Sequence, residues 1–216
     1  MTLEEVKRLI SEGEGQHIEF KRKVAFPEKV IKEIVAFANS SGGYLFVGID
    51  DDGTVYGSKI PDEEVFALNT AIDQYCKPRI QYTYELVPVS AKRTVIVYHV
   101  AASKKKPHYV IEESDSSRGK AFVRVDDRSI QASREVREII KRQDRGKGVR
   151  FSYGDHEKWL MNFLAENDQI TLKQFINMTN VNKFRASKTL VLLVLANVLR
   201  VHPEEKEDFY SLQQYD

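Results

Sequence analysis

The amino-acid sequence predicts an α/β fold of the α+β type: a mixed β-sheet with flanking helices, followed by a small second domain. Two observations support this prediction. Up to about residue 145, short segments with the two-residue apolar alternation of strands are interspersed with amphipathic helical segments. After residue 150, three helical segments precede a hairpin, a pattern typical of a winged helix, which is a variant of the helix-turn-helix. We therefore predict two domains, covering residues 1–145 and 150–216.

The expected helices of the first domain share an apolar stripe and a recognisable start. Thr2 precedes two glutamates at the first start, and Pro27 opens the second helix. The expected helices cover residues 2–10, 27–38, 62–75 and 133–142. The segment 143–148 is polar, contains glycine and lacks apolar periodicity, so it is the best linker candidate.

The expected strands follow from alternation or from short apolar runs. Ile18 and Phe20 alternate with Glu19, while 44–49 is almost continuously apolar and fits a central strand buried on both faces. The aspartates at 50–52 and Gly53 predict a hairpin turn into residues 54–57. Further strands are expected at 80–87 and 94–100, and a strand pair is expected at 108–111 and 121–125.

The second domain is expected to contain three helices and a terminal hairpin. The helical patterns cover residues 155–166, 171–178 and 183–198, and the hairpin strands cover 199–202 and 209–212.

The overall charge of +1 conceals a basic segment. Residues 101–150 carry 14 basic and 8 acidic side chains, whereas the segments before and after them are mildly acidic. One cysteine excludes a disulfide framework and a cysteine-based zinc cluster. The chain lacks an apolar run of about 20 residues and a secretion signal, so we expect a cytoplasmic protein with no membrane partner.

Three carboxylates in the first domain could converge. Glu19 lies on the polar side of an expected strand, Asp50 at the exit of its neighbour, and Glu14 at a preceding turn. Oxygen ligands of this kind suit a hard divalent cation, and Lys21 could balance charge or contact a phosphate. The alternative is that Asp50 is a turn residue, Glu14 a solvated group and Glu19 a strand ion pair. The spacing alone favours this alternative.

Several motifs resemble the AlbA-type domain of the Schlafen family over roughly residues 4–140. They are Glu14-x-x-x-x-Glu-Phe-Lys21, Ala36-Phe-Ala-Asn-x-x-Gly-Gly43, Gly48-Ile-Asp-Asp-Asp-Gly53 and Phe122-Val-Arg-Val125. The resemblance implies a nucleic-acid-binding domain. In nuclease members, three acidic residues form a metal-dependent RNA-cleaving centre, which by motif position would be Glu14, Glu19 and Asp50 with Mg²⁺ or Mn²⁺. The glycines do not form a P-loop, because they precede a strand and no Gly-Lys-Ser/Thr follows.

The basic segment is the second candidate site. Clustered positive charge near aromatic side chains suits phosphate contact and base stacking, and here His108, Tyr109 and Phe122 are interspersed. The alternative is a solvated loop paired with nearby acidic residues, and the family resemblance favours nucleic acid. The candidate contacts are Lys104, Lys105, Lys106, Arg118, Lys120, Arg124 and Arg128.

The third candidate site is the start of the long helix in the second domain. Lys183, Arg185 and Lys188 lie where a recognition helix reaches DNA. However, residues 151–216 carry a net charge of −2, and the expected wing at 203–208 is acidic. A dimerisation or partner-docking domain is therefore an open alternative.

Three functions follow from these sites. The leading hypothesis is a DNA-binding transcriptional regulator that acts as a homodimer. The second is a metal-dependent endoribonuclease that uses Glu14, Glu19 and Asp50. The third is a protein-interaction adaptor.

Overall fold

The computed structural model describes residues 1–111, 119–143 and 153–214. Contacts between Cα atoms divide the chain into two compact units, Met1–Ile130 and Gln131–Asp216. In the first unit the helices are α1 (Leu3–Ile10), α2 (Pro27–Asn39) and α3 (Pro61–Tyr75). Its strands are β1 (Ile18–Lys21), β2 (Gly43–Val47), β3 (Cys76–Lys77), β4 (Tyr82–Ser90), β5 (Arg93–Val100), β6 (Tyr109–Ile111), β7 (Gly119–Lys120), β8 (Phe122–Val125) and β9 (Arg128–Gln131).

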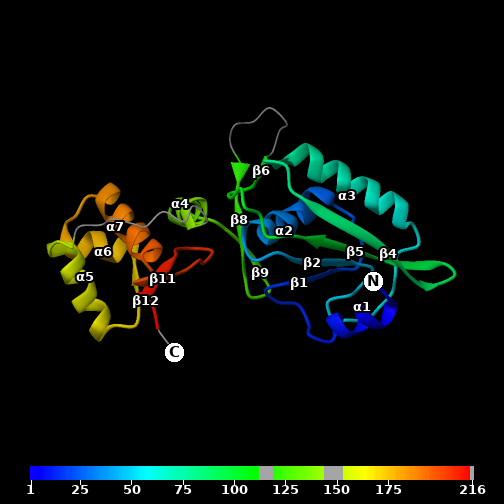
Figure 1. Cartoon of the computed structure of the whole chain (residues 1–216), viewed down its shortest axis with the longest axis horizontal. Helices are drawn as coiled ribbons and strands as arrows, with labels where there is room; N and C mark the ends of the chain where they lie inside the picture. The colour runs from blue at the N-terminus through cyan, green and yellow to red at the C-terminus, as the bar shows by residue number, and fades with distance from the viewer. Residues whose placement is uncertain (112–118, 144–152, 215–216) are drawn as a thin grey trace. The chain divides into compact units, whose positions relative to one another are not determined.

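The main sheet of the first unit is mixed, as the sequence predicts. Its order is β1-β2-β5-β4, with β1 parallel to β2 and the other neighbours antiparallel. Helices α2 and α3 cover one face and α1 covers the opposite face (Figure 1). The alternation of β2 accounts for this arrangement, because Leu45 packs towards α2 and α3 while Phe46 packs with Phe20 towards α1. The predicted α+β class is confirmed.

Helix α2 is the most deeply buried helix of this unit. Pro27 stands at its first turn, where the missing N–H costs nothing. Its apolar side chains, from Val30 to Ala38, are buried against the sheet and α3. The helix ends at Asn39, directly before the turn that leads into the central strand β2. The chain is thus brought to one end of the sheet at residues 39–43.

One expected pairing in the first unit is shorter than predicted, and another is wrong. The turn at residues 50–53 is present, because the N–H of Gly53 donates to the carbonyl oxygen of Asp50, and the chain then returns antiparallel through a bridge between Ile49 and Val55. Residues 54–57 do not form a regular strand. The segments at 108–111 and 121–125 do not pair with each other. Instead, β6 pairs with β3 and β7, while β8 pairs with β9.

The second unit contains α4 (Arg134–Gln143), α5 (Asp155–Glu166), α6 (Leu172–Thr179) and α7 (Lys183–Leu195), with strands β10 (Ile170–Thr171), β11 (Leu199–His202) and β12 (Phe209–Leu212). Helix α4 therefore falls in this unit, whereas the sequence pattern placed it at the end of the first. Most of the predicted linker, 143–148, lies outside the described residues.

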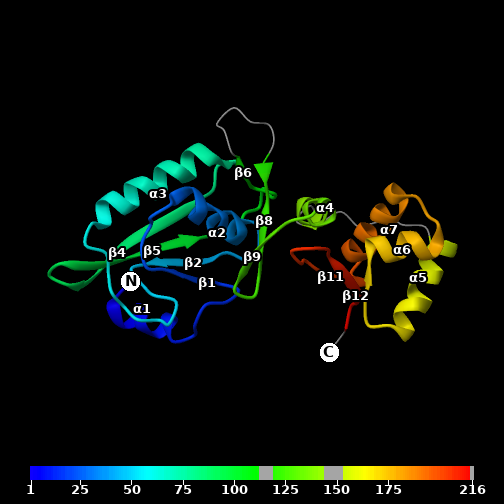
Figure 2. The same ribbon diagram turned by 180° about the vertical axis from the view of Figure 1, so that it is seen from behind.

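The strands of the second unit form a small sheet in the order β10-β12-β11, and helices α5, α6 and α7 are grouped beside it (Figure 2). Thr171 and Asn182 cap α6 and α7 by accepting hydrogen bonds from backbone N–H groups. Leu160, Phe175, Leu190 and Tyr210 form the centre of its core. Within the described part of the chain, no helix is both long and apolar enough to cross a bilayer.

Candidate nucleic-acid interface

The glycine-rich turn between α2 and β2 is a tight packing site. Gly42 has φ +79°, and a Cβ there would lie 2.7 Å from the carbonyl oxygen of Val100. A Cβ on Gly43 would lie 2.5 Å from the ring of Phe37. Both glycines therefore allow close approach of the chain to its own neighbours, which explains them without a bound phosphate.

Asn39 fastens this turn to two distant segments. Its side chain is only 1% exposed. The amide Nδ2 donates hydrogen bonds of 2.9 Å to the carbonyl oxygens of His108 and Phe122, and Oδ1 accepts a bond of 2.7 Å from the N–H of His108. The bonds to His108 are buried and the bond to Phe122 is part-buried, so Asn39 supplies partners to backbone groups that have little access to water. The end of α2 is thus tied to β8 and to the residue before β6.

The basic loop, which we define as Lys104–Lys106, is anchored beside this turn. The N–H of Ser103 donates to the carbonyl oxygen of Ala38 over 2.9 Å, and Lys106 Nζ donates to the carbonyl oxygen of Ser40 over 2.8 Å. Lys104 and Lys105 are exposed. The fold therefore holds two exposed cations next to residues 38–43, while the third lysine serves as an anchor.

The three aromatic residues expected near the basic loop differ in exposure, and a further pair of rings lies on the neighbouring strands. His108 is buried, whereas Tyr109 and Phe122 are half-buried. In addition, the half-buried Tyr44 on β2 stacks on His99 of β5, with 4.7 Å between ring centroids and 27° between planes. His99 is exposed and lies five residues before the basic loop. The only signal for this pair in the sequence is that each ring belongs to an apolar strand, and their cross-strand register cannot be read from that.

Arg124 does not contact nucleic acid as predicted, because its side chain is completely buried (0% exposed). Its guanidinium pairs with Glu19 Oε2 at 2.7 Å and with Glu33 Oε2 at 3.1 Å. It also donates to the backbone carbonyl oxygens of Gly15 and Ile18. The arginine points inward from β8 to neutralise two buried carboxylates, so the prediction is corrected to a structural role.

Glu19 belongs to this buried ion network. It is buried on β1, where one oxygen pairs with Lys21 and the other with Arg124. Burial raises the pKa of Glu19, and the nearby carboxylate of Glu33 adds to this increase, against the opposing effects of Lys21 and Arg124. Both oxygens of this predicted metal ligand therefore face cationic side chains of the chain itself.

The other two predicted ligands have separate partners. Asp50 Oδ2 lies 3.0 Å from Arg22 Nη1, and Glu14 Oε1 accepts a 2.8 Å hydrogen bond from the N–H of Phe20. Among the residues that the structure describes, no group of three or more His, Cys, Asp or Glu side chains could hold a metal ion. As arranged, these donors do not fit Mg²⁺ or Mn²⁺, and the three-carboxylate site stays a prediction without geometric support.

The remaining basic candidates of the first unit are distributed along its smaller strands. Lys120 on β7 and Arg128 on β9 are exposed. Arg118 lies outside the described residues.

His108 makes the stability of this region sensitive to pH. Its Nδ1 lies 2.8 Å from the carbonyl oxygen of Pro78, and burial lowers its pKa below the usual value near 6.5. As the pH falls below about 6.5, the unfolded chain binds a proton that the folded chain does not. We therefore expect the free energy of unfolding to be fully retained above this pH and to fall by up to ~1.4 kcal/mol per pH unit below it.

Urea unfolding of the wild type and of His108→Gln between pH 5 and 8 measures this effect. The difference between the two proteins isolates His108, because burial lowers the pKa of His202 as well and its contribution is common to both. Parallel pH profiles would contradict the assignment.

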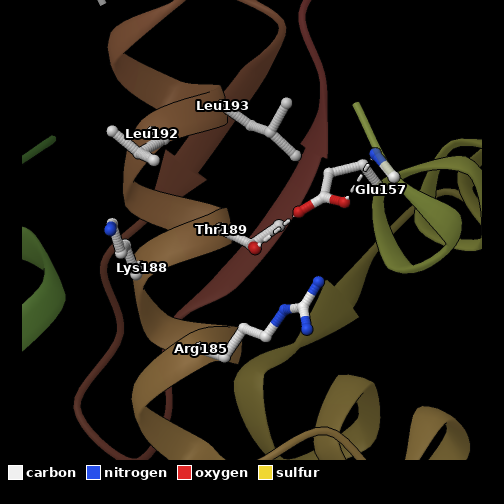
Figure 3. Close-up of a pocket in the computed structure, with 7 residues that line it drawn as sticks. Glu157, Arg185, Lys188, Thr189, Leu192 and Leu193 are labelled. Carbon is white, nitrogen blue, oxygen red and sulfur yellow. Dashed lines mark hydrogen bonds between the residues drawn. The ribbon is translucent and has the colours of Figure 1, made fainter. Parts of the chain in front are cut away.

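In the second unit, Lys183, Arg185 and Lys188 are exposed on the first turns of α7. Arg185 and Lys188 also line a pocket of about 210 Å³ beside α5. Figure 3 shows Arg185 on the side of α7 that faces Glu157, whose carboxylate accepts hydrogen bonds from the Thr189 hydroxyl (2.9 Å) and the N–H of Gly154 (3.0 Å). Burial alone would raise the pKa of Glu157, but these bonds, with Arg185 nearby, lower it overall. The predicted cations are thus brought to one end of α7.

Comparison with known proteins covers mainly the first unit. Residues 14–133 match the family model described as Schlafen, AlbA_2. The solution structure of the N-terminal domain of a protein related to the ATP-dependent DNA helicase RecG, from Nitrosomonas europaea, is 25% identical. It superposes with a TM-score of 0.42 over 56% of this chain and 88% of that domain. A crystal structure from Corynebacterium diphtheriae is 19% identical, with a TM-score of 0.43 over 70% of this chain and 29% of that one.

Proposed function

The chain belongs to the Schlafen AlbA_2 family, which suggests a nucleic-acid-binding domain, and from this membership we propose that the protein is a transcriptional regulator that binds DNA. The basic loop is the observation that carries the proposal. Lys104 and Lys105 are exposed, and the loop is fixed by hydrogen bonds from Ser103 and Lys106 to the end of α2. A loop held in this way presents its charges without losing much conformational entropy when it binds phosphates.

The Tyr44–His99 pair supports the same surface. His99 is exposed, and the chain runs from it directly into the basic loop. Aromatic rings beside cations can stack on bases while lysines contact the phosphate backbone. The proposed interface therefore combines His99, Tyr44, Lys104 and Lys105.

We propose that the second unit is a winged helix that adds a second DNA contact. The α6–turn–α7 segment, with the hairpin β11–β12 and the short strand β10 paired to β12, supports this reading. Lys183, Arg185 and Lys188 would then lie at the start of the recognition helix. We also propose that the protein acts in the cytoplasm, and that it binds paired DNA half-sites as a homodimer. Light scattering coupled to size-exclusion chromatography tests the dimer.

Removing the charges of the basic loop tests the proposed function. We expect Lys104→Gln/Lys105→Gln to weaken binding to duplex DNA about tenfold at 50 mM salt. Because two phosphate contacts are lost, the slope of log K against log salt concentration should become shallower by about 1.8. Fluorescence anisotropy with labelled duplexes at several salt concentrations measures both quantities.

The matched control is Lys59→Gln/Lys92→Gln, which removes the same charge. Both lysines are exposed near the start of β5, the opposite end of that strand from the basic loop. Equal losses for the two double variants would refute a localised interface.

Parallel incubation of RNA with Mn²⁺ tests the endoribonuclease hypothesis, since cleavage that Asp50→Ala abolishes would favour it. An absence of binding to DNA and RNA would favour the adaptor.

A further inference from the structure

Phe184 is an exposed aromatic side chain in an unusual setting. It is the second residue of α7, and it is 66% exposed. Lys183 and Arg185 flank it in the sequence, and Lys188 follows one helical turn later on the same side. A large apolar ring in water loses the free energy that burial would provide, so an apolar group of a partner placed against it would recover part of that free energy.

The rest of the unit covers the other sides of α7. Ala186 and Leu190 are buried in the core. The hydroxyl of Ser187 donates to Glu135 of α4 over 2.6 Å, and the hydroxyl of Thr189 donates to Glu157 of α5 over 2.9 Å. Within the described residues, Phe184 and Lys188 are exposed one turn apart on the same side of α7, and this side is open to an external partner.

The charge of this surface selects the chemistry of the partner. Lys183, Arg185 and Lys188 are all exposed on the first turns of α7, which has no acidic residue in its first turn. A partner must therefore be strongly anionic and must also offer a small apolar group to the ring. The major groove of DNA meets both requirements, because phosphates line it and each thymine presents a C5-methyl group there.

The turn between β11 and β12, at residues 203–208, is acidic, but it repels DNA less strongly than its four carboxylates indicate. Asp208 is buried and accepts a hydrogen bond of 3.2 Å from the N–H of Glu204. Glu207 Oε1 accepts a bond of 3.3 Å from the N–H of Lys173 on α6. Two of the four carboxylates are thus engaged by backbone groups of their own unit.

We propose that Phe184 contacts the C5-methyl group of a thymine in the major groove, so that this protein reads a thymine at a defined position of its DNA site. The inference rests on the proposed function, and specifically on α7 as the recognition helix. Residues near the start of such a helix reach base edges, and apolar contact with a thymine methyl is an established mode of readout.

Replacing thymine by uracil tests this contact, because the two bases differ by that methyl group alone. Duplexes selected from a random library by the full-length protein provide the binding site, and each thymine is then replaced singly by deoxyuridine. We expect one replacement to weaken wild-type binding about fourfold, the effect of one buried methyl group. Phe184→Ala should bind the thymine and uracil duplexes equally.

Met178→Ala is the matched control. Met178 is 55% exposed near the end of α6, and its variant should keep the preference for thymine. Wild-type protein that binds all thymine and uracil duplexes equally would overturn the inference, as would Phe184→Ala that retains the preference. Selection of no duplex at all, or of RNA only, would overturn the DNA-binding function itself and the thymine contact with it.

Discussion

Arg124→Met is expected to lower the free energy of unfolding of the first unit by about 3–5 kcal/mol, because it leaves two buried carboxylates without their main cation. The side chain of Arg124 is 0% exposed, and its guanidinium lies within 3.1 Å of oxygens of both Glu19 and Glu33. Two backbone carbonyl oxygens also lose their donor. Urea unfolding followed by far-UV circular dichroism measures the loss.

A charge-compensated variant separates the ion network from simple loss of volume. Adding Glu19→Gln and Glu33→Gln to Arg124→Met removes the uncompensated charges, so much of the lost stability should return. Arg8→Met, at an exposed position of α1, removes the same charge and should cost less than about 0.5 kcal/mol. A compensated variant as unstable as Arg124→Met would show that packing, not charge, accounts for the effect.

The same residue shows where sequence reasoning stops. A charged residue in a strand is normally exposed, so the arginine of Phe122-Val-Arg-Val125 is a natural candidate for a phosphate contact. Its partners, Glu19 and Glu33, lie some hundred residues earlier in the chain. Their approach depends on the docking of β8 beside α2, which no local pattern encodes.

The parts of the fold that could be predicted are those set by local chemistry. Thr2, Pro27 and Asn182 mark helix starts because each satisfies or avoids an unpaired N–H group. The pairing of β6 could not be predicted, because its partners β3 and β7 are two-residue strands without a periodic pattern. The basic loop was visible as a charge cluster, but the anchoring role of Lys106 depends on a backbone oxygen distant in the sequence.

Asn39→Leu is expected to cost about 3–5 kcal/mol of unfolding free energy, although leucine has nearly the same volume. Three backbone groups would lose their partner: the buried N–H and carbonyl oxygen of His108, and the part-buried carbonyl oxygen of Phe122. Each unsatisfied buried group costs about 1–3 kcal/mol. Because these bonds connect α2 to β8 and to the chain after the basic loop, hydrogen exchange in β6 and β8 should accelerate as well.

Asn39→Asp decides whether the direction of these hydrogen bonds matters. Aspartate has the shape of asparagine and can still accept from the N–H of His108, but its second oxygen would face two carbonyl oxygens that need a donor. We therefore expect a loss of at least 2 kcal/mol, comparable with that of the leucine variant. Ser41→Ala, at an exposed position of the same turn, should change stability by less than about 0.5 kcal/mol. A loss below 1 kcal/mol for Asn39→Asp would mean that the turn is held by packing around Phe37 and the glycines, and not by the amide of Asn39.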